Sequence, residues 1–121
     1  NDQDLPSVLT YMGIGLKESG EFRRALTVLG QAEALDPHRT EVHNLMGFCH
    51  FMLKEHAAAI ACFEKAVALD PSSAIDYANI ASNYRDLGET KKAVRYYELA
   101  LELDPTIDFA RDNLRKLSGK R

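Results

Sequence analysis

Apolar residues recur along this chain at spacings of three and four, which is the period of amphipathic helices. One pattern near the start consists of Leu9, Met12, Gly13 and Leu16. A second pattern, with small residues on either side of a large one, consists of Ala25, Leu29 and Ala32. Because these spacings return to one side of a helix, each pattern predicts a helix whose small residues let a neighbouring helix approach closely.

Both patterns return at intervals of 34 residues. The alanine-rich pattern returns as Ala59, Phe63, Ala66 and then as Ala93, Tyr97, Ala100. The first pattern returns as His43, Met46, Gly47, His50 and then as Tyr77, Ile80, Ala81, Tyr84. Each unit closes with Leu-Asp-Pro, at Pro37, Pro71 and Pro105. Proline lacks an amide hydrogen and disfavours helical geometry in the residue before it, so three helices must end at equivalent places. A fixed period of this size predicts a stack of like helical units.

The resulting expectation is an all-α chain with helices at about residues 7–19, 22–35, 41–53, 56–69, 74–87, 90–103 and 107–118. Gly20 and Gly88 suit the left-handed backbone that ends a helix, and Lys54 occupies the equivalent place in the second unit. A residue with a side-chain hydroxyl lies near the start of the helix that follows each Leu-Asp-Pro. We expect these three residues to cap the exposed amide groups of that helix: Thr40, Ser73 and Thr106.

With these residues the chain resembles the tetratricopeptide repeat (TPR) family, whose unit has the pattern W-x2-L-G-x2-Y, then A-x3-F, then P. The resemblance covers three tandem repeats, 6–39, 40–73 and 74–107, in a single domain over residues 1–121. We interpret the last helix, 107–118, as a capping helix, with the first half of a further repeat as the alternative. The resemblance implies seven helices stacked as helix-turn-helix repeats in a right-handed superhelix, an α-solenoid. The family's tryptophan is replaced by Leu9, His43 and Tyr77.

Composition restricts the classes of partner. The 121 residues are 45% hydrophobic and 27% charged with a formal net charge of −3. No basic stripe occurs, so nucleic acid is not an expected partner. No apolar run approaches the ~18 residues of a transmembrane helix, so membrane insertion is not expected either. The sequence begins at Asn1 without a signal-like segment, and we expect it to be part of a longer protein. These residues specify no compartment, although the cytoplasm is slightly favoured.

Residue types that carry catalysis or bind metals do not cluster in the sequence. His43 and His50 share one predicted helix but lie two turns apart, and no Cys-x2-Cys or His-Glu-x2-His spacing occurs. We expect both histidines to pack in place of the family's aromatic residues. Cys49 and Cys62 are expected to be buried free thiols, with a disulfide as the less favoured alternative. No nucleophile elbow or phosphate loop is present. We therefore expect no enzyme activity, no metal and no cofactor, so function should be binding.

The resemblance also implies a concave groove, lined by the first helix of each repeat, that takes an extended peptide or a helix from a partner. Carried over by phase, the candidate groove residues are Tyr11, Ile14, Asn44, Leu45, Phe48, Phe51, Met52, Ile75, Asn79, Ser82, Arg85 and Asn113. Four of them would form an apolar strip in the middle of the groove: Leu45, Phe48, Phe51 and Met52. The alternative is that Phe48 and Met52 pack between adjacent first helices. The asparagines could hydrogen-bond a peptide backbone.

One TPR subclass holds the C-terminal carboxylate of chaperone tails with a clamp of Lys, Asn, Asn, Lys and Arg. The corresponding places here are occupied by Thr10, Ile14, Leu45, Ile75 and Asn79, so that clamp is absent. The sequence thus predicts an interaction module, in a scaffold or adaptor role, that binds an apolar or amphipathic peptide segment of a protein partner. Two alternatives remain: a structural scaffold that forms homo-oligomers, or an accessory TPR domain of a larger enzyme or secretion component.

Overall fold

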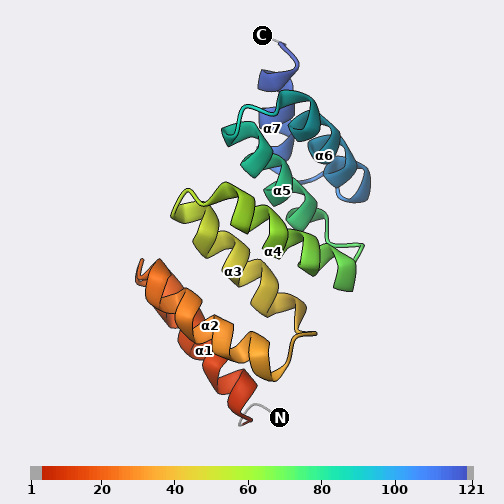
Figure 1. The fold of residues 1–121 in the computed structure, drawn as a ribbon. Helices are drawn as coiled ribbons and strands as arrows, with labels where there is room; N and C mark the ends of the chain where they lie inside the picture. Colours follow the sequence, from red (N-terminus) through yellow and green to blue (C-terminus); the bar gives the residue numbers. More distant parts are fainter. Residues whose placement is uncertain (1–3, 120–121) are drawn as a thin grey trace.

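The fold of this chain is all-helical. The computed structural model describes residues 4–119, and this part of the chain contains seven α-helices and no strand (Figure 1). Their bounds are α1 Leu5–Glu18, α2 Phe22–Leu35, α3 Thr40–Met52, α4 His56–Leu69, α5 Ala74–Asp86, α6 Thr90–Leu103 and α7 Asp108–Leu117. The expected number and order of helices are confirmed, and so is the expected α-solenoid fold.

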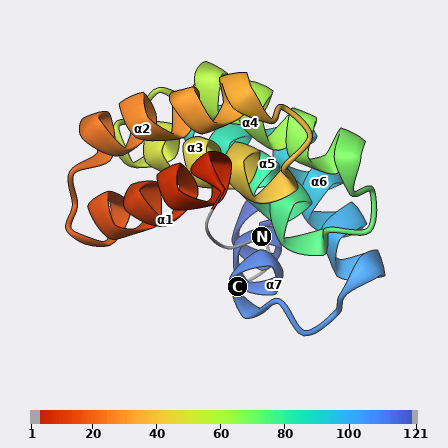
Figure 2. The ribbon, with the colours of Figure 1, turned by 90° about the horizontal axis from the view of Figure 1, so that it is seen from below.

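The helices form three hairpin pairs, α1 with α2, α3 with α4 and α5 with α6, and α7 follows the last pair (Figure 1). Each helix packs against the next one along the chain. Seen from below, the stack is curved, with α2, α4 and α6 in the outer layer and α1, α3, α5 and α7 toward the inner side (Figure 2). We call this inner side, formed by α1, α3, α5 and α7, the concave face.

Small residues are required where the helices of a pair meet. Gly13 lies so close to Leu29 that a Cβ atom there would be 2.5 Å from the leucine side chain. At Gly47 a Cβ atom would be 2.8 Å from the ring of Phe63. The alanines of the repeated pattern are fully buried: Ala25, Ala32, Ala59, Ala66, Ala93 and Ala100. Close packing thus explains why the sequence keeps small residues at these positions.

The turn inside each pair needs a left-handed residue. Gly20 and Gly88 each have a φ of +81°, and Lys54 adopts a φ of +61° at the equivalent place. A side chain is disfavoured in this region, because its Cβ atom approaches the following carbonyl oxygen. The second repeat therefore has the same turn as the other two, but with a lysine in a left-handed conformation that favours glycine.

The hydroxyl residues between repeats do not cap helices as expected. Thr40 is the first residue of α3, after Arg39. The hydroxyl of Ser73 donates to Asp76 at 2.7 Å, and that of Thr106 donates to Asp104 at 2.6 Å, instead of accepting from the next helix. Thr40 and Thr106 miss the cap position by one residue, because Arg39 and Ile107 are the N-cap residues of α3 and α7. Ser73 is the N-cap residue of α5 but makes no side-chain cap hydrogen bond. The side-chain cap that does occur was not foreseen: Asp4 accepts from the amide of Ser7 at the start of α1.

The last helix covers α6. Ala110 is fully buried in an apolar cluster with Tyr97 and Ala100 of α6, and Ile107, Leu114 and Leu117 pack against it. The opposite face of α7 is exposed and charged, with Asp108, Arg111, Asp112 and Arg115. This arrangement fits a capping helix, and it equally fits the first helix of a further repeat.

Candidate functional site on the concave face

Large apolar side chains are exposed on all four helices of the concave face. Tyr11 of α1 is 57% exposed, Phe48 of α3 is 39%, Ile75 of α5 is 46% and Phe109 of α7 is 37%. Met52, one turn after Phe48, is 45% exposed. The packing of the stack therefore leaves at least one large apolar side chain open on each inner helix.

Phe48 is held in place from the side while it stays open to solvent. The edge of its ring meets Phe22, the first residue of α2, with centroids 6.1 Å apart. The ammonium nitrogen of Lys17 lies over the ring, 5.3 Å from its centroid. A cation in this position is attracted to the electron-rich ring face. The contact from Phe22 was not foreseen, because that residue belongs to a second helix and the groove was expected to be lined by first helices.

The middle of the expected apolar strip is less open than the sequence suggested. Leu45 is only 9% exposed and belongs to the first core cluster. It lies three residues after Val42 and four before Cys49, which are fully buried, so it turns into the same seam. Phe51 is half-buried and meets the His56 ring edge-on, with centroids 5.7 Å apart. Ile14 is half-buried against the first core cluster. Phe48 and Met52 are the open members of the strip.

Ser82 also departs from the expectation of an open groove residue. It is 6% exposed, and its hydroxyl lies 2.7 Å from the phenol oxygen of buried Tyr97. Each hydroxyl satisfies the other inside the stack, so Ser82 has no side-chain surface to offer a ligand.

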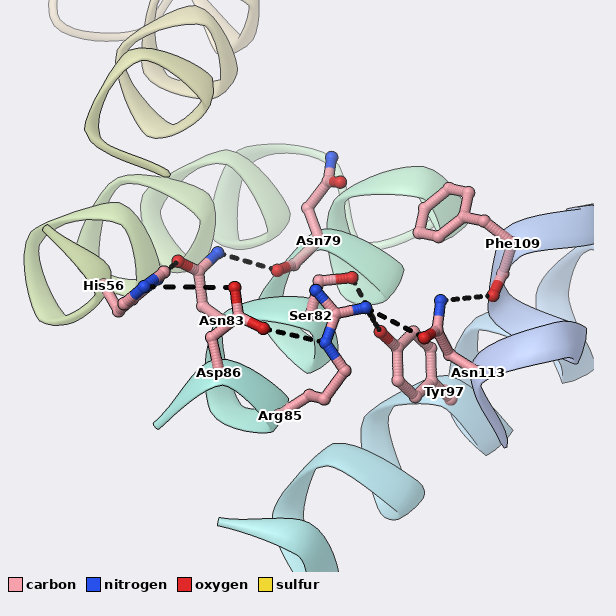
Figure 3. A network of polar contacts seen from close by, with 9 residues as sticks. All are labelled: His56, Asn79, Ser82, Asn83, Arg85, Asp86, Tyr97, Phe109 and Asn113. Carbon is pink, nitrogen blue, oxygen red and sulfur yellow. Dashed lines mark hydrogen bonds and ion pairs between the residues drawn. The ribbon is translucent and has the colours of Figure 1, made fainter. Parts of the chain in front are cut away.

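A chain of polar contacts crosses the C-terminal half of the concave face (Figure 3). Arg85 is its centre: Nε donates to Asp86 at 2.9 Å, and Nη1 donates to Oδ1 of Asn113 at 2.9 Å. The amide of Asn113 is oriented by its own donor group, which binds the carbonyl of Phe109 at 2.8 Å. Arg85 and Asn113, both candidate groove residues, therefore bind one another and join α5 to α7.

The same chain of contacts continues toward α4. The amide of Asn83 donates to the carbonyl of Asn79 at 2.8 Å, which leaves Oδ1 as the acceptor. His56 Nδ1 lies 2.9 Å from that oxygen, so it must carry the hydrogen. His56 Nε2 then lies 3.9 Å from the carboxylate of Asp86. Beside this contact is a cleft of about 420 Å³, lined by Phe51, Met52, Lys54, His56 and Asp86.

The other two candidate asparagines, Asn79 and Asn44, differ in their side-chain contacts. The side chain of Asn79 is half-buried, and Figure 3 shows its amide pointing away from the polar contacts around Arg85. Asn44 is half-buried beside Asp76, whose carboxyl group it hydrogen-bonds. Asp76 is itself only 1% exposed, and this burial raises its pKa against the opposing effect of the hydrogen bonds from Ser73 and Asn44.

The two cysteines and His43 lie in the interior of the stack or at its seams. Cys49 and Cys62 are free, and burial raises the pKa of both thiols, that of Cys62 to about 11. At neutral pH they are therefore protonated and poor nucleophiles. His43 is 3% exposed and donates from Nε2 to the carbonyl of Pro37 at 2.7 Å. Within residues 4–119, no three metal-ligating side chains come together.

None of the helices in the described part of the chain is both long enough and apolar enough to span a bilayer. The helices are instead short and amphipathic, and each uses its apolar side to pack against its neighbours in the stack. The exposed apolar side chains are therefore those that the packing between helices does not cover.

A family model described as tetratricopeptide repeat matches residues 38–106. The chain belongs to the tetratricopeptide repeat family. This agrees with the 34-residue period and with the closely packed helix pairs described above.

Relatives of this TPR chain are much longer proteins. It is 34% identical over 86 residues to a probable UDP-N-acetylglucosamine–peptide N-acetylglucosaminyltransferase SEC of Arabidopsis thaliana, covering 71% of this chain and 9% of the relative. It is 32% identical over 98 residues to anaphase-promoting complex subunit 6 of the same plant, covering 77% of this chain and 18% of the relative. The similarity is thus confined to a small part of each relative.

Among solved structures, this TPR domain is similar over nearly its whole length to the first TPR domain of Spaghetti (RPAP3) bound to the HSP90 peptide SRMEEVD. The TM-score is 0.91 at 27% sequence identity, and the match covers 95% of this chain and 91% of the other. The two chains therefore share the complete domain architecture.

Proposed function

We propose that the concave face binds a protein segment that presents spaced apolar side chains, so that the domain acts as a scaffold or adaptor. The observation that carries this proposal is the exposure of Tyr11, Phe48, Ile75 and Phe109 on four successive inner helices. Burying such side chains against a ligand releases free energy, and aromatic anchors in interfaces are often worth about 2 kcal/mol or more each. Phe48 is the best anchor, because Phe22 and Lys17 already fix its ring.

The similar TPR domain in the solved complex holds an HSP90 peptide that ends in two glutamates, a valine and an aspartate. The concave face of this chain is poorly suited to such an acidic tail. Thr10 is 2% exposed with its hydroxyl bound to the carbonyl of Pro6, and Leu45 is buried. Two cations of the inner helices already have partners, Lys17 over the ring of Phe48 and Arg85 with Asp86 and Asn113. An apolar or amphipathic segment fits these residues better.

Polar groups would hold the ligand backbone and set its register. Asn79 is the best candidate for a backbone contact, because its amide points away from the polar contacts around Arg85 (Figure 3). Asn44 lies one helix away and is partly committed to Asp76. An extended peptide offers one donor and one acceptor per residue, which an asparagine amide can satisfy together.

The proposal is tested by selecting peptides from a displayed random library on the wild-type domain and on two variants. Phe48→Glu places a charge among the exposed apolar residues of the concave face. Leu103→Glu is the matched control, since Leu103 is 45% exposed but lies at the end of α6, outside the concave face. The expected result is that selected peptides carry spaced apolar residues, bind Leu103→Glu like wild type, and lose at least about tenfold in affinity for Phe48→Glu.

Other outcomes would overturn the proposal. If Phe48→Glu binds the selected peptides as well as wild type, the ligand lies elsewhere. A preference for synthetic SRMEEVD over every apolar peptide would mean that the concave face takes acidic tails after all. Light scattering across a range of concentrations addresses homo-oligomerisation: a self-associating wild type with a monomeric, folded Phe48→Glu variant would identify the concave face as an assembly surface.

Catalysis is not part of the proposal for these residues. The transferase activity named for the Arabidopsis relative is that of a protein of which this chain spans 9%. We infer that, if this chain is part of an enzyme, it contributes recognition of a partner or substrate protein. Protonated thiols and the contacts of Arg85, Asp86 and His56 with one another are consistent with this role.

A further inference from the structure

The cleft of about 420 Å³ beside Met52 contains polar groups that take no part in binding apolar side chains. Phe51 and Met52 form its apolar lining, and Lys54, His56 and Asp86 form its polar lining. The side chain of His56 is 14% exposed and that of Asp86 is 31% exposed, so both are accessible to a ligand. We call this space the His56 cleft.

The fold does not require polar residues at this place. Three polar residues meet where the second repeat joins the third: His56, Asn83 and Asp86. Their equivalents one 34-residue period earlier, where the first repeat joins the second, are apolar residues and a thiol: Phe22, Cys49 and Met52. Phe22 packs there against the core cluster that contains Cys49. The same contact between repeats can therefore be made without polar side chains.

The contacts around His56 leave one of its ring nitrogens without a hydrogen. Nδ1 donates to Asn83, whose amide is oriented by its own hydrogen bond to the carbonyl of Asn79. The neutral ring carries a single hydrogen, so Nε2 is an acceptor. Phe51 meets the ring edge-on and helps to hold it in this orientation.

The carboxylate of Asp86 does not satisfy Nε2. Its Oδ2 lies 3.9 Å from Nε2, which is longer than a hydrogen bond, and both atoms are acceptors. The other oxygen, Oδ1, already accepts from Nε of Arg85 at 2.9 Å. Two acceptors therefore stand side by side at the cleft. A group with two N–H donors on one nitrogen would satisfy both of them.

The charges at the cleft disfavour an ion as the ligand. An anion would be repelled by Asp86 and would meet acceptors. A cation would be opposed by Lys54, which lines the cleft, and by Arg85, which offsets the charge of Asp86. A primary carboxamide is neutral, offers two N–H donors to the acceptors, and has a carbonyl oxygen to which the Lys54 ammonium can donate.

We propose that the His56 cleft binds the primary carboxamide of a glutamine or asparagine side chain in the segment held by the concave face. The aliphatic part of that side chain packs against Phe51 and Met52, which also belong to the apolar strip, so one segment supplies both the carboxamide and the apolar anchors. The inference rests on the proposed function for the source of the carboxamide. It adds a polar position to the recognition of an otherwise apolar segment.

The first experiment examines the cleft without a peptide. N-acetylglutamine methylamide is added to the wild-type domain while the side-chain nitrogen resonances of His56 are followed by NMR. We expect Nε2 to give the signal of an unprotonated acceptor nitrogen and to shift on titration. The matching norleucine, glutamate and arginine derivatives should bind at least about tenfold more weakly. A ring protonated on both nitrogens at neutral pH, an unchanged Nε2 signal, or equal binding of the arginine derivative would each overturn the inference.

A double variant tests the residues that form the site. His56→Phe with Asn83→Cys copies the pair Phe22 and Cys49 of the preceding repeat, so no buried amide is left without its histidine partner. Backbone amide shifts of the residues that line the cleft report binding in this variant, which should lose the preference for the glutamine derivative. The control is His38→Phe, an exposed residue outside the cleft, and it should bind like wild type.

Peptide selection separates failure of this inference from failure of the proposed function. Peptides selected on the wild-type domain should carry glutamine or asparagine beside their apolar residues, and those selected on the double variant should keep only the apolar residues. Apolar peptides with no such preference on the wild type would overturn the inference and leave the proposed function standing. A response of His56 to the glutamine derivative without any selected peptide would support the carboxamide site and overturn the proposed function.

Discussion

Arg85 of α5 and Asn113 of α7 form a hydrogen bond of 2.9 Å between Nη1 and Oδ1, 28 residues apart in sequence. The bond is a polar link between the last helix and α5 of the third repeat, and the side chain of Arg85 is 29% exposed. The same residues border the C-terminal end of the concave face (Figure 3). This pair of side chains therefore adds a polar link to the apolar packing that attaches α7, and it also borders the candidate binding surface.

Asn113→Ala should loosen α7. The substitution removes the acceptor and leaves part of the Arg85 guanidinium without it, for an expected loss of about 1 kcal/mol in the free energy of unfolding. Amide exchange should accelerate in α7 and α6 and stay unchanged in α1 and α2, because each unit contacts only its neighbours. Arg115→Ala, which breaks an exposed pair with Asp112, is the control and should cost less than about 0.5 kcal/mol. Equal losses in the two variants would contradict the assigned role of Asn113.

Gly47→Ala should overpack the second helix pair. Its new methyl group would lie 2.8 Å from the ring of Phe63, and crowding of this kind costs about 1–3 kcal/mol. Gly30→Ala is a sharp control, since Gly30 lies inside α2 and a methyl group there would meet nothing within 4 Å. Removing a glycine from a helix interior should stabilise the domain by about 0.5–1 kcal/mol. Urea unfolding measures both, and shifts of the same sign would show that the pair is not closely packed at Gly47.

Lys54→Gly should stabilise the domain. Lys54 has a φ of +61° in the turn where the other repeats have glycine, and relief of this left-handed strain should yield about 0.5–1 kcal/mol. Lys54→Ala keeps the strained backbone and removes the charge, so it should leave the thermal midpoint nearly unchanged. A gain in Lys54→Ala equal to that in Lys54→Gly would assign the effect to charge instead of conformation.

Asp76→Asn tests the pH dependence of stability. Burial raises the pKa of Asp76 in the folded state, so the folded chain holds this proton more tightly than the unfolded chain does. The stabilising contribution of the protonated group is therefore complete below the unfolded pKa and is lost as the pH rises through the folded pKa. Asp76→Asn should be at least as stable as wild type at neutral pH, and its advantage should disappear on acidification. An advantage that persists at a pH below the ordinary aspartate pKa would contradict this.

Most of the fold could be predicted because it follows from the spacing of apolar residues, small residues and prolines along the sequence. The 34-residue period and the three Leu-Asp-Pro stops located the helices of the three repeats, and the amphipathic pattern of residues 107–118 located the last helix. The small residues at Gly13 and Gly47 correctly identified where the paired helices meet. These features depend on a few neighbouring residues and on the fixed geometry of a helix. Thr40 and Thr106 failed as predicted caps because α3 and α7 begin one residue away from the predicted starts, with Arg39 and Ile107 as N-cap residues, and local spacing does not specify a helix start to a single residue.

The candidate site was harder to predict, since helical phase specifies a direction but not which neighbour fills the space there. Tyr11 and Leu45 occupy equivalent positions in adjacent repeats, yet Tyr11 is 57% exposed and Leu45 is 9% exposed. Leu45 joins the core cluster around Leu29, whereas Tyr11 does not. Likewise, the pairing of Arg85 with Asn113 joins helices whose relative placement no local pattern specifies.

Among residues 4–119, the buried apolar residues form three clusters. The first, around Leu29, shares no residue with the one around Phe63, while Tyr77, Tyr84 and Tyr96 pack against both of the later two. The molecule is thus a series of small cores in contact, so its two ends can melt at different concentrations of denaturant. A ligand that contacts Tyr11 at one end and Phe109 at the other would bridge those cores from outside. Its binding would make a graded unfolding curve more nearly all-or-none, and the steepness of melting would then report occupancy of the concave face.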